Sequence, residues 1–337
     1  MMGQVPLRKM TERSFPPLFY RAHKVKQLQK KFPPLVPSLV AVVFLASFLV
    51  VSRWSSPPSA PEEAPFTLAS FKEKFDILGP EEHFNHTEDG KIWHIAMNRS
   101  AGCEIQFKER YRYGYFSLKL KAVGGNSAGV VTSFYMNSDR GSGRYRDELD
   151  IELLGNRTGE PYLLQVNMFV NGTGEKETRH LLWFDPTEDY HTYSILWNFH
   201  HIVYFVDDIP IRVYKNDGKP NGFYPYLKPM YILATIWDAE EWATEGGRVK
   251  TDWSLVPFVS SMKDFAVEGC LWEDPYPACV STTTENWWDQ FPAWHLTEKQ
   301  KKDYEWVQKN FLVYDYCHDK RRHPISPPEE CFLNWWE

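Results

Sequence analysis

Residues 146–155 read Arg-Asp-Glu-Leu-Asp-Ile-Glu-Leu-Leu-Gly. Carboxylates alternate strictly with aliphatic residues inside this stretch, in the order Glu148, Leu149, Asp150, Ile151, Glu152 and Leu153. Because successive side chains of a β-strand point to opposite faces, the pattern predicts a strand with three acids on one face and three aliphatic groups on the other. Like charges in file repel one another, so they add nothing to stability by themselves. We therefore interpret the stretch as a row of functional acids rather than a solvated strand face.

The residue types in this row fit glycoside chemistry. Retaining glycosidases use two carboxyl groups about 5–5.5 Å apart, one as nucleophile and one as general acid and base. The backbones of Glu148 and Glu152 are expected about 13 Å apart, at a rise of roughly 3.3 Å per residue, and two long glutamates can close most of that gap. Asp150, midway, is expected to hydrogen-bond one glutamate and to separate the pair electrostatically.

Length and charge narrow the class of protein. At 337 residues the chain can bury a full core, and an all-β domain of this size is ordinary. Residues 1–34 hold eight Lys and Arg and one acid, a balance of +7, and the whole chain carries −6, which leaves −13 for the remainder. An acidic body argues against nucleic acid as a partner, because phosphates require a positive groove.

Short strands separated by turn residues recur from residue 66 onward. Apolar and polar residues alternate at 116–121, before Gly-Gly-Asn, and a strand at 202–206 is followed by the turn Asp207-Asp208. Many short strands with such punctuation indicate an all-β sandwich or jelly roll. Near the end of the chain, a capping box at 297–300 predicts a helix with one apolar face.

The N-terminal part is predicted to direct the chain across a membrane. Residues 35–51 are mostly apolar and follow the basic segment 1–34, which is expected to stay in the cytosol. Two interpretations stay open: a single-pass signal anchor near the lower length limit for a span, and the apolar region of a cleaved signal peptide. The anchor fits better, because the basic leader is longer than signal peptides usually have. Residues 52–65, rich in Pro and Ser, are expected to form a short stalk.

Cysteines and glycosylation sequons indicate an oxidising compartment. Four cysteines cluster late in the chain, and sequence alone permits three pairings among Cys270, Cys279, Cys317 and Cys331. The remaining Cys103 is expected to be a buried thiol. Four Asn-x-Ser/Thr sequons begin at Asn85, Asn98, Asn156 and Asn171.

The acidic stretch also carries a resemblance to a known family. It is similar to the E-[IL]-D-x-E-x-L-G-N signature of plant xyloglucan endotransglucosylase/hydrolases, in glycoside hydrolase family 16. The similarity extends from about residue 66 to the C-terminus, with ordered blocks at 182–187, 191–198, 242–247, 250–253, 306–310, 316–317 and 327–331. The family usually has His where this chain has Arg146, and Phe where it has Ile151 and Leu153. Arg146 is placed to pair with a neighbouring acid.

The resemblance implies a fold and catalytic roles. The fold is a concanavalin-like β-jelly-roll sandwich, with a catalytic domain at 66–268 and a disulfide-stapled, short helical C-terminal extension at 269–337. Glu148 is implied as the nucleophile, Asp150 as the helper and Glu152 as the acid/base. The implied disulfides join Cys270 to Cys279 and Cys317 to Cys331. Among the sequons, Asn156 matches a glycosylated position of the family.

Substrate contacts are implied by the same comparison of residues. Aromatic residues make up 16% of the chain, and Trp and Tyr rings stack on the flat C–H faces of pyranose rings. The implied substrate-binding residues are Tyr135, Gln165, Asn167, Glu175, Glu177, Trp237, Glu241, Trp242, Gly246 and Arg322. We expect no cofactor and no metal site, because His191, His200 and His201 lack the ligand spacing of zinc sites.

The expected function is retaining cleavage of the β-1,4-glucan backbone of xyloglucan, with transfer of the glycosyl-enzyme to another xyloglucan chain or to water. Two alternatives are another family-16 endo-β-glucanase and a noncatalytic, lectin-like wall-binding protein. The expected partners are xyloglucan donor and acceptor, with membrane contact through residues 35–51 if these stay uncleaved. The protein is expected to be a monomer that follows the secretory pathway to the cell wall, or a single-pass type II membrane protein that acts in the secretory pathway or at the wall.

Overall fold

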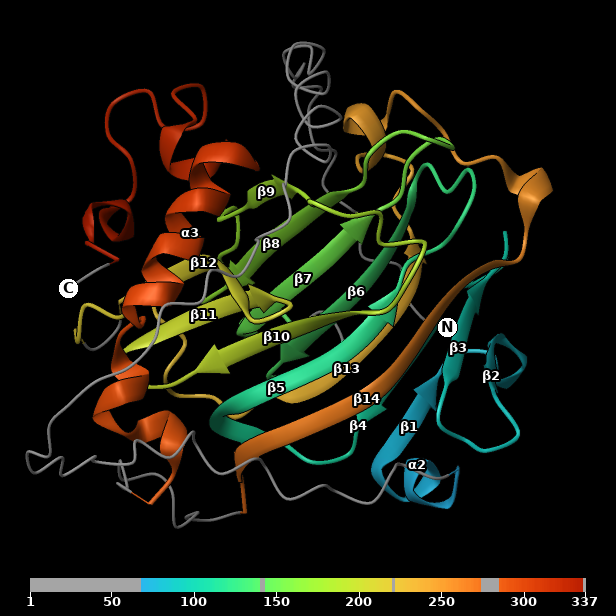
Figure 1. The fold of residues 1–337 in the computed structure, drawn as a ribbon, viewed down its shortest axis with the longest axis horizontal. Helices are drawn as coiled ribbons and strands as arrows, with labels where there is room; N and C mark the ends of the chain where they lie inside the picture. The colour runs from blue at the N-terminus through green and yellow to red at the C-terminus, as the bar shows by residue number, and fades with distance from the viewer. Residues whose placement is uncertain (1–67, 140–142, 220–221, 274–284, 336–337) are drawn as a thin grey trace, which may run out of the picture. The chain divides into compact units, whose positions relative to one another are not determined.

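Two antiparallel β-sheets form the folded part of the protein and lie one behind the other in Figure 1. The structure is a computed structural model that describes residues 68–139, 143–219, 222–273 and 285–335. The segments expected at 1–34, 35–51 and 52–65 lie outside the described residues, as does Cys279. Within the four described ranges, no helix combines the length and apolarity needed to cross a bilayer.

The first sheet has eight strands and contains the acidic row. In spatial order these are β1 (Phe75–Leu78), β4 (Cys103–Phe107), β13 (Tyr231–Asp238), β6 (Val130–Asn137), β7 (Glu148–Leu154), β8 (Leu163–Phe169), β9 (Thr178–Leu181) and β15 (Leu312–Asp315). The acidic strand β7 is therefore central, with strands on both sides, and the sequence prediction of a strand at this stretch is confirmed.

The second sheet has seven strands and packs against the first. Its spatial order is β12 (Ile209–Lys215), β11 (His201–Val206), β10 (His191–Trp197), β5 (Tyr111–Lys121), β14 (Phe258–Leu271), β3 (Trp93–Met97) and β2 (Phe84–His86). The described helices are α2 (Leu68–Lys74), α3 (Glu298–Asn310) and the short 3-10 turns η1 (Glu81–His83), η2 (Thr244–Gly247), η3 (Trp253–Leu255), η4 (Trp287–Asp289), η5 (Phe291–Trp294), η6 (Tyr316–His318) and η7 (Glu329–Phe332). The predicted all-β sandwich with a short helical extension is confirmed.

The aliphatic face of β7 faces the core between the two sheets. Leu149, Ile151 and Leu153 are each at most 1% exposed and belong to one large apolar cluster with residues of both sheets. Burying this face leaves the alternate positions of β7 on the outer face of the eight-stranded sheet. The alternation seen in the sequence thus fixes which way the acids point.

Two local predictions are confirmed by the structure. Strands β11 and β12 form the expected hairpin, and Asp207 and Asp208 both have positive φ, 49° and 63°, as a tight two-residue turn requires. Helix α3 begins at the predicted capping box, where the Thr297 hydroxyl accepts a hydrogen bond from the Gln300 backbone N–H and the Gln300 side chain accepts one from the Thr297 N–H.

The C-terminal extension is built into the sandwich rather than appended to it. Helix α3 buries its apolar face, including the fully enclosed Val307, and packs beside β12, where Gln308 Nε2 donates to the Ile211 carbonyl oxygen at 2.9 Å. After α3, β15 pairs antiparallel with β9 and adds an eighth strand to the sheet that carries the acids. The extension therefore widens the outer face of that sheet.

One of the expected disulfides closes a loop in this extension. Cys317 and Cys331 are joined, with their Cα atoms 5.6 Å apart, as the family resemblance implied. Cys270 is also disulfide-bonded, and its expected partner Cys279 lies outside the described residues. Cys103 is a free thiol only 2% exposed, and burial, with a smaller effect of Glu104, raises its pKa to about 11. The expectation of a buried thiol is confirmed.

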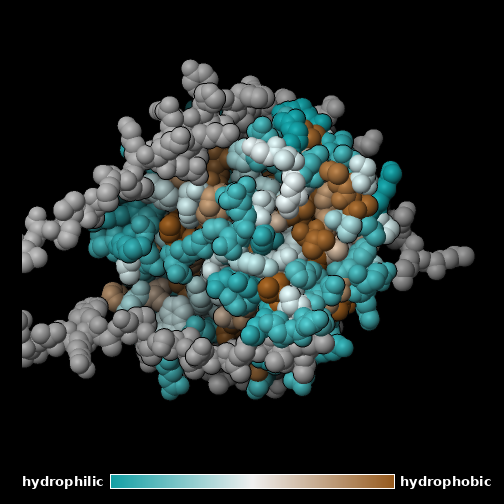
Figure 2. All heavy atoms as spheres, turned by 45° about the vertical axis from the view of Figure 1, so that its right-hand side comes forward, coloured by the Kyte–Doolittle hydropathy of each residue, from teal (hydrophilic) through white to brown (hydrophobic). Residues whose placement is uncertain are grey.

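Hydrophilic and hydrophobic side chains both reach the surface in the view of Figure 2. On the face turned forward in Figure 2, hydrophobic side chains form separate groups among hydrophilic ones. Burial of apolar area, at roughly 25 cal/mol per Å², is the main stabilising contribution of the core.

The packing beneath β7 predicts the effect of a cavity. Shortening Ile151 to Ala removes buried methyl groups and should lower the free energy of unfolding by about 2–5 kcal/mol in urea titrations. Val259→Ala is the matched control, because that strand residue is 40% exposed and should lose less than about 1 kcal/mol. Equal losses for the two variants would contradict the placement of Ile151 in the core.

Candidate active site

Each acid of β7 lies opposite one residue of β6 and one of β8. The register pairs Glu148 with Asn137 and Phe169, Asp150 with Tyr135 and Asn167, and Glu152 with Ser133 and Gln165. Directly paired residues of an antiparallel sheet point to the same face, with Cβ atoms about 4.5–5.5 Å apart. Three rows of polar and aromatic side chains therefore share the outer face of the sheet.

Glu148 is held by donors from two directions. Arg146 Nε donates to Glu148 Oε2 at 2.7 Å, and Arg146 Nη2 donates to Oε1 at 3.2 Å. From β6, Asn137 Nδ2 donates to Oε2 at 2.7 Å. The pairing of Arg146 with a neighbouring acid, expected from the sequence, is confirmed and falls on Glu148.

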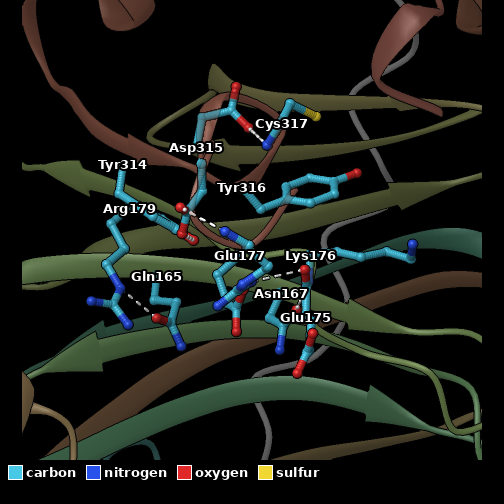
Figure 3. Close-up of polar contacts among 12 residues, drawn as sticks. Gln165, Asn167, Glu175, Lys176, Glu177, Arg179, Tyr314, Asp315, Tyr316 and Cys317 are labelled. Carbon is cyan, nitrogen blue, oxygen red and sulfur yellow. Dashed lines mark hydrogen bonds and ion pairs between the residues drawn. The ribbon is translucent and has the colours of Figure 1, made fainter. Parts of the chain in front are cut away.

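Glu152 has a different set of neighbours. Gln165 Nε2 donates to Glu152 Oε2 at 2.6 Å, and the oxygen of the same amide accepts a hydrogen bond from Arg179 Nε at 2.7 Å. Because an arginine side chain can only donate, the Gln165 oxygen must face Arg179, and the Gln165 amide nitrogen is left to face Glu152. The guanidinium of Arg179 lies 5.5 Å from the ring centre of Tyr314, a residue of β15. Figure 3 shows the hydrogen bond between Arg179 and Gln165, with Tyr314 beside Arg179.

The environment of Glu152 changes its acidity. Burial raises the pKa of Glu152 to about 7; the Gln165 hydrogen bond opposes the rise, and the charge of Glu148 adds to it. A carboxyl group with a pKa near 7 can both give and take a proton near neutral pH. The two glutamates of β7 therefore differ in their surroundings: one is paired with a cation, and the other tends to keep a proton.

Asp150, between them, departs from one expectation. Among the described residues it has no hydrogen bond to either glutamate, so the expected contact is wrong for this arrangement. Its side chain is short, and donors from neighbouring strands already bind Oε2 of both glutamates. Burial, followed by the charges of Glu148 and Glu152, raises the pKa of Asp150 well above its usual range. The raised pKa favours the protonated, neutral form of Asp150, which lies between the glutamates without a direct bond to either.

Aromatic residues flank the acids on the side of β6 and β13. Tyr135 is half-buried, and its hydroxyl donates to Glu104 Oε2 on β4 at 2.6 Å. Trp237 donates through its indole nitrogen to Ser133 Oγ at 3.2 Å, and its ring centre lies 5.9 Å from that of Trp242. Both indoles are half-buried and pack against a small apolar cluster of Val131, Leu154, Ala239 and Ala243.

A second group of expected residues gathers beyond β8. Asn167 accepts a hydrogen bond from the Lys176 backbone N–H at 3.2 Å, which holds the segment 175–177 beside the strand (Figure 3). The side chain of Arg322, which lies in the loop closed by the disulfide, pairs with Glu177 and donates to the Glu175 carbonyl oxygen at 3.0 Å. The C-terminal loop and the β8–β9 connection are thus joined by ionic and hydrogen bonds.

The remaining expected residues lie in the connection after β13. The Glu241 side chain is 84% exposed and pairs with Lys250 at 2.9 Å, and Gly246 has a positive φ of 70° inside η2. No hydrogen bond or ion pair of the described residues joins Glu241 to the acids of β7. Asn156 directly follows the β7 segment, is half-buried, and donates through its amide to the Pro161 carbonyl oxygen at 2.9 Å.

Several residues of the site were not predicted from the sequence. Asn137 binds Glu148, Ser133 binds Trp237, and Glu104 binds Tyr135. Asn137 and Ser133 are two positions away from Tyr135, so the period of a strand could have placed all three on one face. Glu104 and Arg179 had no such signal, because their contacts depend on which strands are neighbours.

Comparison with known proteins gives a consistent result. The chain matches the family model described as "Glycosyl hydrolases family 16" over residues 71–255, and the one described as "Xyloglucan endo-transglycosylase (XET) C-terminus" over residues 282–331. It is similar to "Probable xyloglucan endotransglucosylase/hydrolase protein 8" of Arabidopsis thaliana, with 60% identity over 269 residues that cover 79% of this chain and 88% of the relative.

Other plant proteins show the same similarity at lower identity. "Probable xyloglucan endotransglucosylase/hydrolase protein 6" of Arabidopsis thaliana is 43% identical over 90% of this chain and 99% of its own length. "Probable xyloglucan endotransglucosylase/hydrolase protein" of Nicotiana tabacum is 43% identical over 81% of this chain and 90% of its own length. The similarity therefore covers nearly the full length of these relatives.

The raised pKa of Glu152 predicts how stability depends on pH. A carboxyl group whose pKa rises on folding, here from 4.5 to about 7, binds its proton more tightly when folded. Its contribution to stability is full below about pH 4.5 and is lost as pH rises through 7, an effect of about 3 kcal/mol at roughly 1.4 kcal/mol per pKa unit. Glu152→Gln should lack this dependence. Urea unfolding of both proteins at pH 4 and pH 8 measures the difference, and an equal gap at the two pH values would contradict it.

Proposed function

Because the chain belongs to the glycosyl hydrolases of family 16, and within them to the plant xyloglucan endotransglucosylase/hydrolases, we propose that it is a retaining enzyme acting on xyloglucan. It cuts the β-1,4-glucan backbone and passes the cut chain to a second xyloglucan or to water. The observation that carries the proposal is the pair of glutamates on one face of β7, one paired with Arg146 and the other with its pKa raised to about 7. In retaining glycosidases, one carboxyl group acts as the acid and the other as the nucleophile, and different surroundings fit them to these roles.

In the proposed first step, Glu148 attacks the anomeric carbon while Glu152 gives its proton to the departing sugar oxygen. The bond from the anomeric carbon to Glu148 forms as the glycosidic bond breaks. In the second step, a sugar hydroxyl or water gives its proton to Glu152, and its oxygen displaces Glu148. Asp150 is the helper: it lies between the two glutamates on the same face of β7, and burial together with their charges raises its own pKa.

We propose that the polymer lies across the outer face of the eight-stranded sheet. Tyr135, Trp237 and Trp242 are suited to stack on sugar rings, because all three are half-buried. Tyr135 lies opposite Asp150, Trp237 bonds Ser133 opposite Glu152, and Trp242 packs against Trp237. On the other side, Gln165, Asn167, Glu175, Glu177 and Arg322 offer polar groups, and Glu241 and Gly246 offer contacts beyond β13. We further propose that 66–268 is the catalytic domain and that 269–337 extends its binding surface through β15.

The C-terminal extension favours this function over the alternatives. A family model named for the xyloglucan endo-transglycosylase C-terminus matches residues 282–331, which include α3, β15 and the Arg322 loop. This favours a xyloglucan enzyme over other family-16 endo-β-glucanases. The presence of both glutamates disfavours a noncatalytic binder.

The chain is proposed to act in the cell wall as a monomer, after passage through the secretory pathway. The disulfide Cys317–Cys331 fits an oxidising compartment. We propose that residues 35–51 stay as a type II membrane anchor rather than being removed as a signal peptide. The first residue of the mature protein distinguishes the two, since a start between 52 and 66 would exclude the anchor.

Removing the nucleophile should abolish both reactions. Purified Glu148→Ala is expected to lose transfer of xyloglucan to labelled xyloglucan oligosaccharides and release of reducing ends, each by at least about a thousandfold. Glu188→Gln is the control: it removes an exposed acid that lies outside β7, in the segment between β9 and β10, and it should keep full activity. Full activity of Glu148→Ala would refute the proposed function.

The Arg322 loop should affect the acceptor more than the chemistry. Arg322→Gln breaks the ion pair with Glu177 and the bond to the Glu175 carbonyl. We expect KM for the acceptor oligosaccharide to rise about tenfold, with a smaller change in kcat. Lys320→Gln removes an exposed cation from the same loop and should leave both constants unchanged. A fall in kcat alone would contradict a role in acceptor binding.

A further inference from the structure

Arg146 binds both oxygens of the carboxylate that the proposed function makes the nucleophile. Its Nε and Nη2 reach Oε2 and Oε1 of Glu148 at 2.7 and 3.2 Å, and the side chains are 18% and 13% exposed. A guanidinium that contacts both oxygens of a carboxylate fixes its plane as well as its position. Because both side chains are less than one-fifth exposed, the ion pair is largely shielded from water and is stronger than an ion pair on the surface.

The guanidinium is held in place by its own neighbours. Its central carbon lies 4.2 Å from the ring centre of Phe169, the residue that lies opposite Glu148 on β8. The Arg146 backbone is bound at both ends, since its N–H donates to the Gly143 carbonyl and its carbonyl accepts from Gly172 N at 2.7 Å. Gly172 has a positive φ of 80°, and a Cβ there would lie 1.9 Å from the Arg144 carbonyl oxygen, so this turn fits tightly against the loop. Arg146 is thus preorganised against Glu148 rather than free to move away.

The donors are distributed unequally over the two carboxylate oxygens. Oε2 accepts from Arg146 Nε and from Asn137 Nδ2, both at 2.7 Å, whereas Oε1 accepts, among the residues that the structure describes, only the longer contact from Arg146 Nη2. The two short hydrogen bonds engage the lone pairs of Oε2 and make this oxygen the weaker nucleophile of the two. We therefore infer that Oε1 is the oxygen that bonds to the anomeric carbon.

Resting on the proposed function, we propose that Arg146 is a positioning residue that shortens the lifetime of the glycosyl-enzyme. When Oε1 bonds to the anomeric carbon, Glu148 becomes a neutral ester and Oε2 its carbonyl oxygen. When the acceptor oxygen attacks, the bond from the anomeric carbon to Oε1 breaks, its electron pair returns to Glu148, and the acceptor proton passes to Glu152. The carboxylate charge is lost in the first step and restored in the second.

Arg146 distinguishes the two states because hydrogen bonds to a charged acceptor are about twice as strong as those to a neutral one. It favours the free carboxylate over the ester, and so it makes Glu148 a better leaving group. The same preference slows formation of the ester. The combined effect is a small steady-state fraction of covalent enzyme and rapid delivery of the glycan to whichever acceptor is bound.

The test measures the covalent enzyme directly. Purified protein is mixed with a defined xyloglucan oligosaccharide long enough to span both sides of the acids, quenched in acid, and weighed by mass spectrometry. In a parallel sample, excess labelled acceptor is added before the quench, and the adduct that remains is measured at successive quench times. In Arg146→Gln, the fraction of enzyme in the adduct should rise and its decay should slow by about tenfold. Arg146→Lys, which keeps the charge but not the planar fork, should lie between Arg146→Gln and the unchanged protein.

Controls separate this inference from folding and from the proposed function. Arg144→Gln removes an equal charge from the same loop, where Arg144 is exposed and lies over the Tyr145 ring, and should decay at the normal rate. Phe169→Leu removes the ring beneath the guanidinium and should also slow decay of the adduct, but by less than Arg146→Gln does. It replaces Arg146→Gln as the test if that variant does not fold. An adduct that decays at the normal rate in Arg146→Gln, or in Phe169→Leu in that case, overturns the inference. Absence of both adduct and label transfer in the unchanged protein overturns the proposed function instead.

Discussion

Mutual repulsion among three carboxylates on one strand is the constraint on which the site depends. The register of β7 with β6 and β8 offsets this repulsion, because it places hydrogen-bond donors opposite the acids. Each acid faces a different pair of side chains, so each is stabilised in a different way. Glu148 receives a cation and an amide, whereas Glu152 receives an amide alone. A slip of one residue in this register would turn the acids into the core and the aliphatic residues outward. The apolar packing of Leu149, Ile151 and Leu153 thus secures the electrostatics on the opposite face.

On the outer face of the sheet, an amide side chain lies between the charged groups of Arg179 and Glu152, which are not in direct contact. Gln165 lies between Arg179 and Glu152, and its fixed orientation carries the influence of the cation to the acid without an ion pair. A direct contact between Arg179 and Glu152 would favour the ionised carboxylate more strongly than a neutral amide does. An amide in that position satisfies the buried oxygen and still allows burial to raise the pKa. The difference between Glu148 and Glu152 therefore depends on which donor each one meets.

Local sequence patterns predicted the parts of the fold that depend on neighbouring residues. Three features could be predicted because each depends on a few consecutive side chains: the alternation at 148–153, the turn Asp207-Asp208 and the capping box at Thr297. The order of the strands was not readable, since β13 lies between β4 and β6 although the chain reaches it much later. For the same reason the contacts of Glu104 and Arg179 were missed. The expected bond from Asp150 was wrong because the competing donors come from other strands.

The strand β15 enters the sheet from the far end of the chain, and Tyr314 on it lies against Arg179, which orients the amide beside Glu152. The terminal segment is thereby connected to the protonation of a residue from the middle of the sequence. We expect chimaeras that exchange this segment between relatives to alter the acidity of Glu152 together with the proposed contacts to the acceptor.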